Sequence, residues 1–445
     1  MFLHEQGEGL AKRLKHVGIE PIAVLPFLLV VLIWILFAYD ARMGFTVFSV
    51  LLALLPFYLP LLLLYHGWIA WIHYIRFKFW LSQEHILLEL EVPQEVEKSP
   101  LAMELFLIAL NNAGGETTFL DRMWLGKFRA VWSLEIASNE GKVNFYIHLR
   151  KQFKNVVEAR MYGQFPEVKM REVPDYARAV PFNTDEYSLF AAEYQFGKPD
   201  AYPIKTYVDY KLDKDPDTEY KVDPISNILE LLGQVGPGEY YWMQIICVAR
   251  KKDQFYGFYS GKNSLEEGMK AEIQAVMTKA AKRAQKVITE SDVTEGKLAL
   301  LTEGEKRAIE ALERSFTKLI FECGIRVMYL GRKENFKGIN NGQVIRFFDS
   351  FKSPEFNSIG ATRGHADFDY PWQDFKGILN RKVMREYYQW YCDRAYFYVP
   401  YDQVPMMMTV EELATLWHFP GSNVKTPSLS RAATRTAEAP ANLPV

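Results

Sequence analysis

The chain has few cysteines and no excess of positive charge. Its 445 residues include three cysteines, Cys247, Cys323 and Cys392, which lie far apart and form no CxxC pair. This spacing argues against a disulfide framework or a zinc knuckle, and such thiols fit a reducing cytoplasm. The formal net charge is −2, so no bulk basic field would draw the chain to nucleic acid.

Familiar catalytic motifs are also missing. The sequence has no G-x-x-x-x-G-K-[ST] phosphate loop, no G-x-S-x-G and no H-E-x-x-H. His365, Asp367 and Asp369 alternate and could hold a metal, but without other His or Cys nearby a solvated loop is the better interpretation. His148 is expected to be an ordinary surface histidine on the outward face of a strand. We therefore expect a protein that is not an enzyme and that has no catalytic, cofactor-binding or metal site.

What the sequence does contain is a strongly apolar stretch over residues 21–65. Two charge-free runs, 21–39 and 45–65, are separated by five residues. Each run has about the 20 residues that a helix needs to cross a bilayer core. The sequence therefore predicts a transmembrane helical hairpin, kinked at the prolines of its second span, and an exit helix ending near residue 82. A cleaved signal peptide and a re-entrant second segment are the less favoured alternatives.

Lysine and arginine set the expected orientation of this hairpin. Three basic residues precede the first run and two follow the second, whereas the connection has only Arg42. The positive-inside rule then places the N-terminal segment, 1–20, and the C-terminus in the cytoplasm, so the protein crosses the membrane twice. The residues expected to anchor it in the bilayer are the two prolines and the aromatic residues near the interfaces: Trp34, Tyr39, Pro56, Pro60, Tyr65, Trp68 and Trp71.

The rest of the chain has the pattern of an α+β protein. In residues 85–175 the order is strand, helix, strand, strand, helix, strand, which is the ferredoxin-like split βαβ pattern. After an irregular linker over 174–201, residues 202–400 are expected to repeat this plan, with 206–212 as the first strand and 395–399 as the closing strand. A Lys- and Glu-rich helical hairpin over 262–318 interrupts this second unit, either as a solvated surface or as an arm that touches a neighbouring subunit.

Two C-terminal segments carry candidate binding residues. A capping box predicts a short helix over 409–418, which either docks a partner or completes the second unit. Its candidate docking residues are Glu411, Glu412, Leu413 and Trp417. Basic and aromatic residues interleave over 381–401, a pattern that can bind single strands, but a helix and strand that close a core explain it better. Direct nucleic-acid binding is therefore disfavoured without being excluded. Residues 422–445 are expected to form a flexible tail.

Several stretches together resemble one bacterial family. They are KSPLAMELFLIALNNAGGETTFLDRMWLGKFRAVWSLEIAS, HLRKQFKNVVEARMYGQFPEVKMREVPDY, LLGQVGPGEYYWMQIICVA, FECGIRVMYLGRK and VEELATLWHFPGSNVKTPSLSRAATRTAEAPANLP. They resemble the membrane-anchored N-terminal region that precedes type IV secretion and conjugative-transfer ATPases, from about residue 85 onward. The resemblance implies the bacterial inner membrane and a hexameric P-loop ATPase as partner. The sequence stops at Val445, where that ATPase core would begin, so it is either a stand-alone anchor or a truncated fusion.

The resulting hypothesis is a non-enzymatic anchor and adaptor of a type IV secretion-like or conjugative machine. It would bind the lipid bilayer, position a P-loop ATPase and form a homo-oligomer, a hexamer with the motor. One alternative is a membrane scaffold or sensor unrelated to transport. The other is a membrane enzyme with its site around residues 365–369, which the missing catalytic motifs disfavour.

Overall fold

The structure of the protein is a computed structural model. It describes residues 34–35, 38–92, 98–112, 114–115, 118–213, 223–250, 253–256, 259–262, 270, 272–275, 277–278, 302–364, 374–398, 401–421 and 429. The chain divides into two compact units, Met1–Tyr74 and Ile75–Val445. The predicted N-terminal segment, most of the first apolar run and most of the 262–318 insertion lie outside the described residues.

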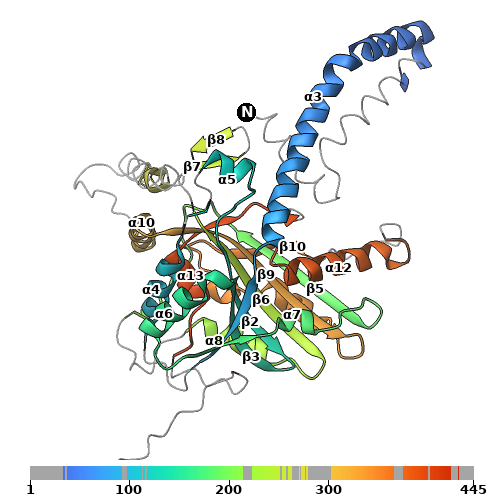
Figure 1. Ribbon diagram of the computed structural model, residues 1–445. Helices are drawn as coiled ribbons and strands as arrows, with labels where there is room; N and C mark the ends of the chain where they lie inside the picture. Colours follow the sequence, from blue (N-terminus) through green and yellow to red (C-terminus); the bar gives the residue numbers. More distant parts are fainter. Residues whose placement is uncertain are drawn as a thin grey trace, which may run out of the picture. The chain divides into compact units, whose positions relative to one another are not determined.

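The long apolar helix α3 (Ala41–Leu81) dominates the described part of the first unit (Figure 1). It is long and apolar enough to cross a membrane. The side chain of Asp40 caps it, because Oδ1 accepts a hydrogen bond from the backbone N–H of Arg42 at 2.9 Å. The predicted connection over 40–44 is therefore wrong in extent, since residues 41–44 form the first turn of α3. The helix continues through Pro56 and Pro60, so the predicted second span and exit helix are one element.

The second unit is built on one antiparallel sheet. Its strands are β1 (His85–Glu91), β2 (Val131–Asn139), β3 (Lys142–Arg150), β4 (Lys169–Val173), β5 (Tyr187–Phe196), β6 (Glu239–Ala249), β9 (Ile320–Arg332), β10 (Ile359–Gly364) and β13 (Met406–Thr409). Their order is β10-β5-β9-β6-β2-β3-β1-β4, and β13 pairs with the start of β9. The two-stranded sheets β7 (Asp253–Tyr256) with β8 (Tyr259–Lys262), and β11 (Phe397–Tyr398) with β12 (Tyr401–Asp402), stand apart from it.

The two halves of this sheet have the same internal order. Within β1 to β4 the strands lie in the order second, third, first, fourth, and β5, β6, β9 and β10 repeat it. The second strands of the halves, β2 and β6, pair edge to edge from Val131 opposite Val248 to Asn139 opposite Tyr240. The halves therefore share one continuous sheet instead of forming separate domains.

Three predicted boundaries in the second half are wrong. Its first strand is β5, which lies inside the predicted linker over 174–201. The predicted strand over 206–212 is a turn, because Asp209 accepts hydrogen bonds from the backbone N–H and hydroxyl of Thr206 and so closes the chain locally. The closing strand is β10, whereas the predicted 395–399 strand contributes only the two residues of β11.

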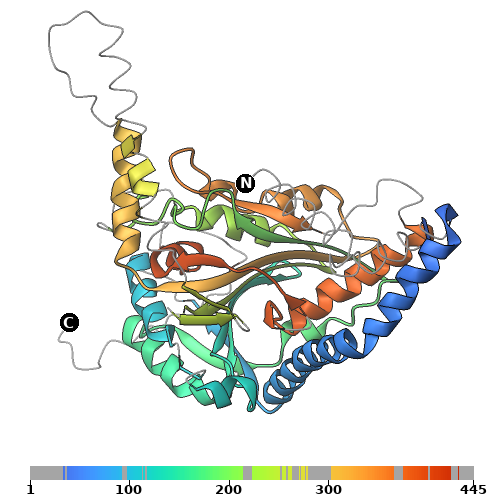
Figure 2. The same ribbon diagram turned by 90° about the horizontal axis from the view of Figure 1, so that it is seen from above.

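Alternation along the strands gives the sheet two differently covered faces. The first face, which includes Ile86, Leu88 and Leu90, packs against α4 (Pro100–Leu110), α6 (Lys154–Gln164), α8 (Ile225–Gly233), α11 (Ile339–Ile345) and α13 (Val410–Leu416). The second face, which includes Leu87, packs against α7 (Tyr176–Ala179) and α12 (Ile378–Cys392). The sheet accordingly runs between α13 and α12 in both views (Figures 1 and 2). Two further helices are α5 (Phe119–Met123) and α10 (Glu303–Phe316).

Two local signals in the sequence are confirmed by the structure. The β2–β3 hairpin is confirmed, and its two-residue turn has Glu140 at φ 54° and Gly141 at φ 90°, as a type I′ turn requires. The capping box is also confirmed, because the Thr409 hydroxyl accepts from the Glu412 N–H while the Glu412 carboxylate accepts from the Thr409 N–H.

Candidate functional site

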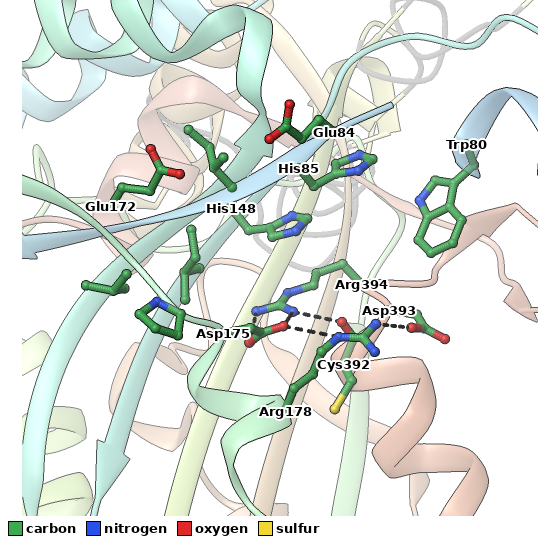
Figure 3. Close-up of a pocket in the computed structure, with 14 residues that line it drawn as sticks. Trp80, Glu84, His85, His148, Glu172, Asp175, Arg178, Cys392, Asp393 and Arg394 are labelled. Carbon is green, nitrogen blue, oxygen red and sulfur yellow. Dashed lines mark hydrogen bonds and ion pairs between the residues drawn. The ribbon is translucent and has the colours of Figure 1, made fainter. Parts of the chain in front are cut away.

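A cavity of about 420 Å³ opens on the second face of the sheet (Figure 3). Trp80 at the end of α3, His85 in β1 and His148 in β3 line one side. Arg178 in α7 and Arg394 after α12 line the other. Residues from four separate stretches of the sequence, 80–85, 148, 178 and 394, therefore meet around one opening.

A stacked pair of histidines forms the floor of this cavity. The register of β1 and β3 sets His85 opposite Arg150 and Leu87 opposite His148, so both imidazoles lie on the same face. Their ring centroids are 5.3 Å apart and their planes are 4° from parallel, and Trp80 lies 6.0 Å from His85. Partial burial under α7 and α12 corrects the expectation that His148 is an ordinary surface residue.

Both histidines are held in the neutral form. Burial lowers the pKa of His85, and the nearby Arg150 lowers it further. Burial also holds the pKa of His148 well below its usual value, with Arg394 adding to the effect. The cavity therefore presents uncharged aromatic rings at neutral pH.

Ion pairs neutralise the charges on the opposite side of the cavity. Arg394 donates to Glu135 at 3.0 Å and to Asp175 at 2.9 Å. Burial alone would lower the pKa of Arg394, but these two carboxylates outweigh it and raise that pKa well above its usual value. Arg178 pairs with Asp393 at 2.6 Å. A ligand would therefore meet arginines that already have carboxylate partners.

The chemistry available here is binding by stacking and hydrogen bonding. The thiol of Cys392 is not activated, because burial raises its pKa to about 11. Among the described residues, no group of three or more His, Cys, Asp and Glu side chains is arranged to hold a metal ion. The candidate metal residues His365, Asp367 and Asp369 lie outside the described part of the chain.

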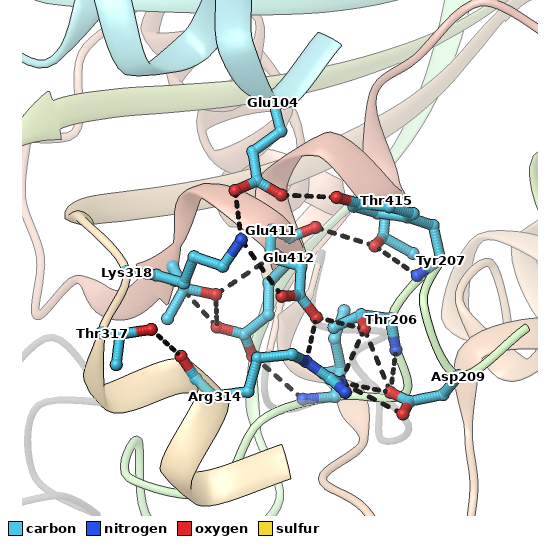
Figure 4. Close-up of polar contacts among 12 residues, drawn as sticks. Glu104, Thr206, Tyr207, Asp209, Arg314, Thr317, Lys318, Glu411, Glu412 and Thr415 are labelled. Atoms are coloured by element: carbon cyan, nitrogen blue, oxygen red, sulfur yellow. Dashed lines mark hydrogen bonds and ion pairs between the residues drawn. The ribbon is translucent and has the colours of Figure 1, made fainter. Parts of the chain in front are cut away.

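The candidate docking residues lie inside the protein, and Figure 4 shows the polar contacts of two of them, Glu411 and Glu412. Glu411, Glu412, Leu413 and Trp417 are all buried, and α13 packs against α4. This burial corrects their expected role as an accessible docking surface and favours the alternative that the helix completes the core.

Polar contacts fix the two glutamates of α13 in place. Glu411 accepts from Arg314 at 2.8 Å and from the Thr206 hydroxyl at 2.5 Å. Glu412 accepts from the backbone N–H of Ile204 at 2.9 Å. The carboxylates of α13 thereby join α10 to the segment that follows β5.

The predicted anchoring residues differ in their exposure. Trp34, Tyr39, Pro56, Pro60 and Tyr65 are exposed, and Trp68 and Trp71 are half-buried. In the segment 381–401, Tyr387 and Tyr391 of α12 are buried against the sheet, whereas Lys382 and Arg385 are exposed.

Sequence analysis missed the residues around Arg394. Ser133 and Glu135 are the polar residues of the alternating pattern in β2, and the polar side of such a strand usually faces solvent. Here that side is covered, and Glu135 accepts a hydrogen bond from Tyr176 at 2.8 Å. The available signal was the long aromatic segment over 381–401, which needs an extended surface to cover.

The fold and the site define an α+β protein with a single large antiparallel sheet and an N-terminal helix suited to a membrane. The chain belongs to the family described as "Domain of unknown function (DUF8128)", whose model matches residues 116–432. No curated protein matches the chain.

Proposed function

We propose that the protein is a non-enzymatic anchor and adaptor of the bacterial inner membrane that positions a P-loop ATPase of a type IV secretion-like or conjugative machine. In this proposal α3 holds the protein in the bilayer, and the unit Ile75–Val445 presents a rigid surface to the motor. The resemblance described above supplies the partner, and the structure of the end of α3 supports the anchoring role.

The observation that carries the proposal is the way α3 ends. Its last two turns belong to the folded unit: Ile75 is 5% exposed, and Phe79 meets Phe128 edge to face at 5.2 Å. The Arg150 guanidinium lies 5.3 Å from the Phe79 ring. Only three residues separate Leu81 from the start of β1 at His85. A tether would need a flexible linker, whereas here the end of α3 is itself packed into the folded unit, which suits an anchor.

Several finer features are part of the same proposal. Residues 21–39 would complete a two-span hairpin with both termini in the cytoplasm. The two halves of the sheet would be ferredoxin-like units, because each has the strand order of the split βαβ fold. The protein would assemble as a homo-oligomer that matches a hexameric motor.

The deciding experiment is a pull-down from detergent-solubilised membranes. The full-length chain should retain a P-loop ATPase, and a version ending at Gly421 tests whether the tail is the tether. The purified full-length protein should itself show no ATPase activity. A folded full-length protein that retains no P-loop ATPase would exclude the adaptor role and favour a scaffold or sensor, for which the cavity at His85 and His148 is the candidate binding site.

Topology can be tested in the same cells. A cysteine placed at the exposed Met43 should react with a membrane-impermeant reagent added from outside, and one placed at the exposed Lys142 should not. Labelling of position 142 in intact cells would contradict the cytoplasmic placement.

A further inference from the structure

Four large apolar side chains are exposed on and just after α5. Phe119 is 60% exposed, Leu120 63%, Trp124 63% and Leu125 51%. The segment is nevertheless well defined, because a capping box between Thr118 and Asp121 opens the helix and Met123 is buried beneath it. We call residues 119–125 the α5 segment. Its exposed side chains are apolar, whereas the exposed side chains of a turn that faces water are usually polar.

The α5 segment is fixed against the end of α3. Gly126 has φ +63°, and a Cβ atom there would lie 2.4 Å from the carbonyl group of Ile75, a contact that only glycine permits. Two residues later, Phe128 packs on Phe79. The segment therefore lies beside residues 75–79 of α3.

The same residues of α3 mark the expected edge of a membrane. From Met43 to Ile75 the sequence has no Asp, Glu, Lys or Arg, and the first charges are those of Arg76 and Lys78. Basic residues at the end of an apolar helix lie at the level of the lipid headgroups. Because Gly126 contacts Ile75, the α5 segment lies at that level too.

Charge favours lipid over a protein partner as the occupant of this surface. In residues 75–81 and 118–128 the basic side chains are Arg76, Lys78, Arg122 and Lys127, and the acidic one is Asp121, which pairs with Lys127 at 3.0 Å. Exposed aromatic and leucine side chains beside an excess of basic residues are typical of elements that lie in the interface of an anionic bilayer.

We propose that the α5 segment is a second membrane contact, which inserts Phe119, Leu120, Trp124 and Leu125 into the interface of the bilayer that α3 crosses. It would hold the folded unit against the membrane surface at two points instead of one. The inference rests on the anchoring role of α3 and is independent of the ATPase partner.

The test places a nitroxide label at one position at a time in the full-length chain, reconstituted in vesicles of phosphatidylcholine and phosphatidylglycerol. The variants are Trp124→Cys, Phe57→Cys in α3 and Ile339→Cys in α11, all at exposed positions. The native cysteines are buried, which makes the labelling selective. The measured quantity is the ratio of two collision rates of the label. One is with oxygen, which dissolves in lipid, and the other is with a nickel complex that stays in water.

Ile339 is a matched apolar control at the other end of the sheet. The strand registers align the start of β1 with the start of β9, near Phe321, and Ile339 follows the far end of β9. Labels at positions 57 and 124 should collide preferentially with oxygen, and the label at 339 with nickel.

Two results would overturn the inference while leaving the anchor intact. The first is that the label at position 124 prefers nickel as strongly as the label at 339 does. The second is that the label at position 124 is protected from both reagents, which would mean contact with a second copy or another protein. A nickel preference at position 57 would overturn the anchor and the inference together. The pull-down reports separately on the ATPase.

Discussion

Replacing Trp417 by alanine distinguishes a core helix from a docking helix. Trp417 is 0% exposed, and its ring lies 5.9 Å from that of Phe145 and 6.2 Å from that of Phe419. Removing a fully buried tryptophan costs the transfer of its apolar surface and leaves a cavity, together about 3–5 kcal/mol. That is a large share of the roughly 5–15 kcal/mol that stabilises a typical domain.

Trp124→Ala is the matched control. It deletes the same side chain from an exposed position of the α5 segment, where the expected cost is below about 0.5 kcal/mol. Both variants should be unfolded by urea in detergent micelles, with far-UV circular dichroism as the probe and the midpoints compared at equal slope. The placement of α13 in the core would be refuted if the two substitutions lowered the free energy of unfolding equally. It would also be refuted if Trp417→Ala left the urea midpoint unchanged but abolished binding of the ATPase.

Three further tests concern the cavity and the junction with α3. Arg394→Met should cost about 3–5 kcal/mol in the same assay, because it leaves the carboxylate of Glu135 buried and unpaired, and adding Glu135→Gln should restore part of the loss. Because the pKa of His148 is lowered in the folded state, the unfolded chain binds the proton first. The contribution of His148 to stability should therefore be full above about pH 6.5 and fall as the pH drops below it. The His148→Gln variant should show a smaller loss of stability at low pH. An unchanged pH profile would contradict the burial of this ring. Gly126→Ala forces a Cβ against the backbone of Ile75 at positive φ, so it should cost more than about 1 kcal/mol in thermal unfolding, and a neutral effect would argue against this contact.

Features that depend on short stretches of chain could be predicted from the sequence. The apolar character of α3 follows from more than thirty consecutive residues without charge, which no distant contact can change. The β2–β3 hairpin follows from alternation on both sides of a Glu140-Gly141 turn, and the start of α13 follows from its own capping box.

The pairing of distant strands was decided by the tertiary structure. β5 lies in a stretch that looks like a linker, and it is a strand because β9 and β10 pair with it on both sides. Joining of the two halves through β2 and β6 likewise brings together residues more than a hundred positions apart. Neither pairing can be predicted from the local sequence, because the edge of a strand has the same backbone donors and acceptors whichever strand pairs with it.

The candidate site shows the same division. Alternation in β3 correctly assigned His148 to the polar side of its strand, but whether that side faces water depends on α7 and α12, which lie elsewhere in the sequence. The carboxylates of α13 also have an ordinary capping pattern, and they are buried because Arg314 and Ile204 supply donors from other elements. The sequence by itself determined the period and polarity of each element. Burial, charge pairing and the cavity were decided only when distant elements packed together, since each of these properties belongs to a contact between residues and not to a residue alone.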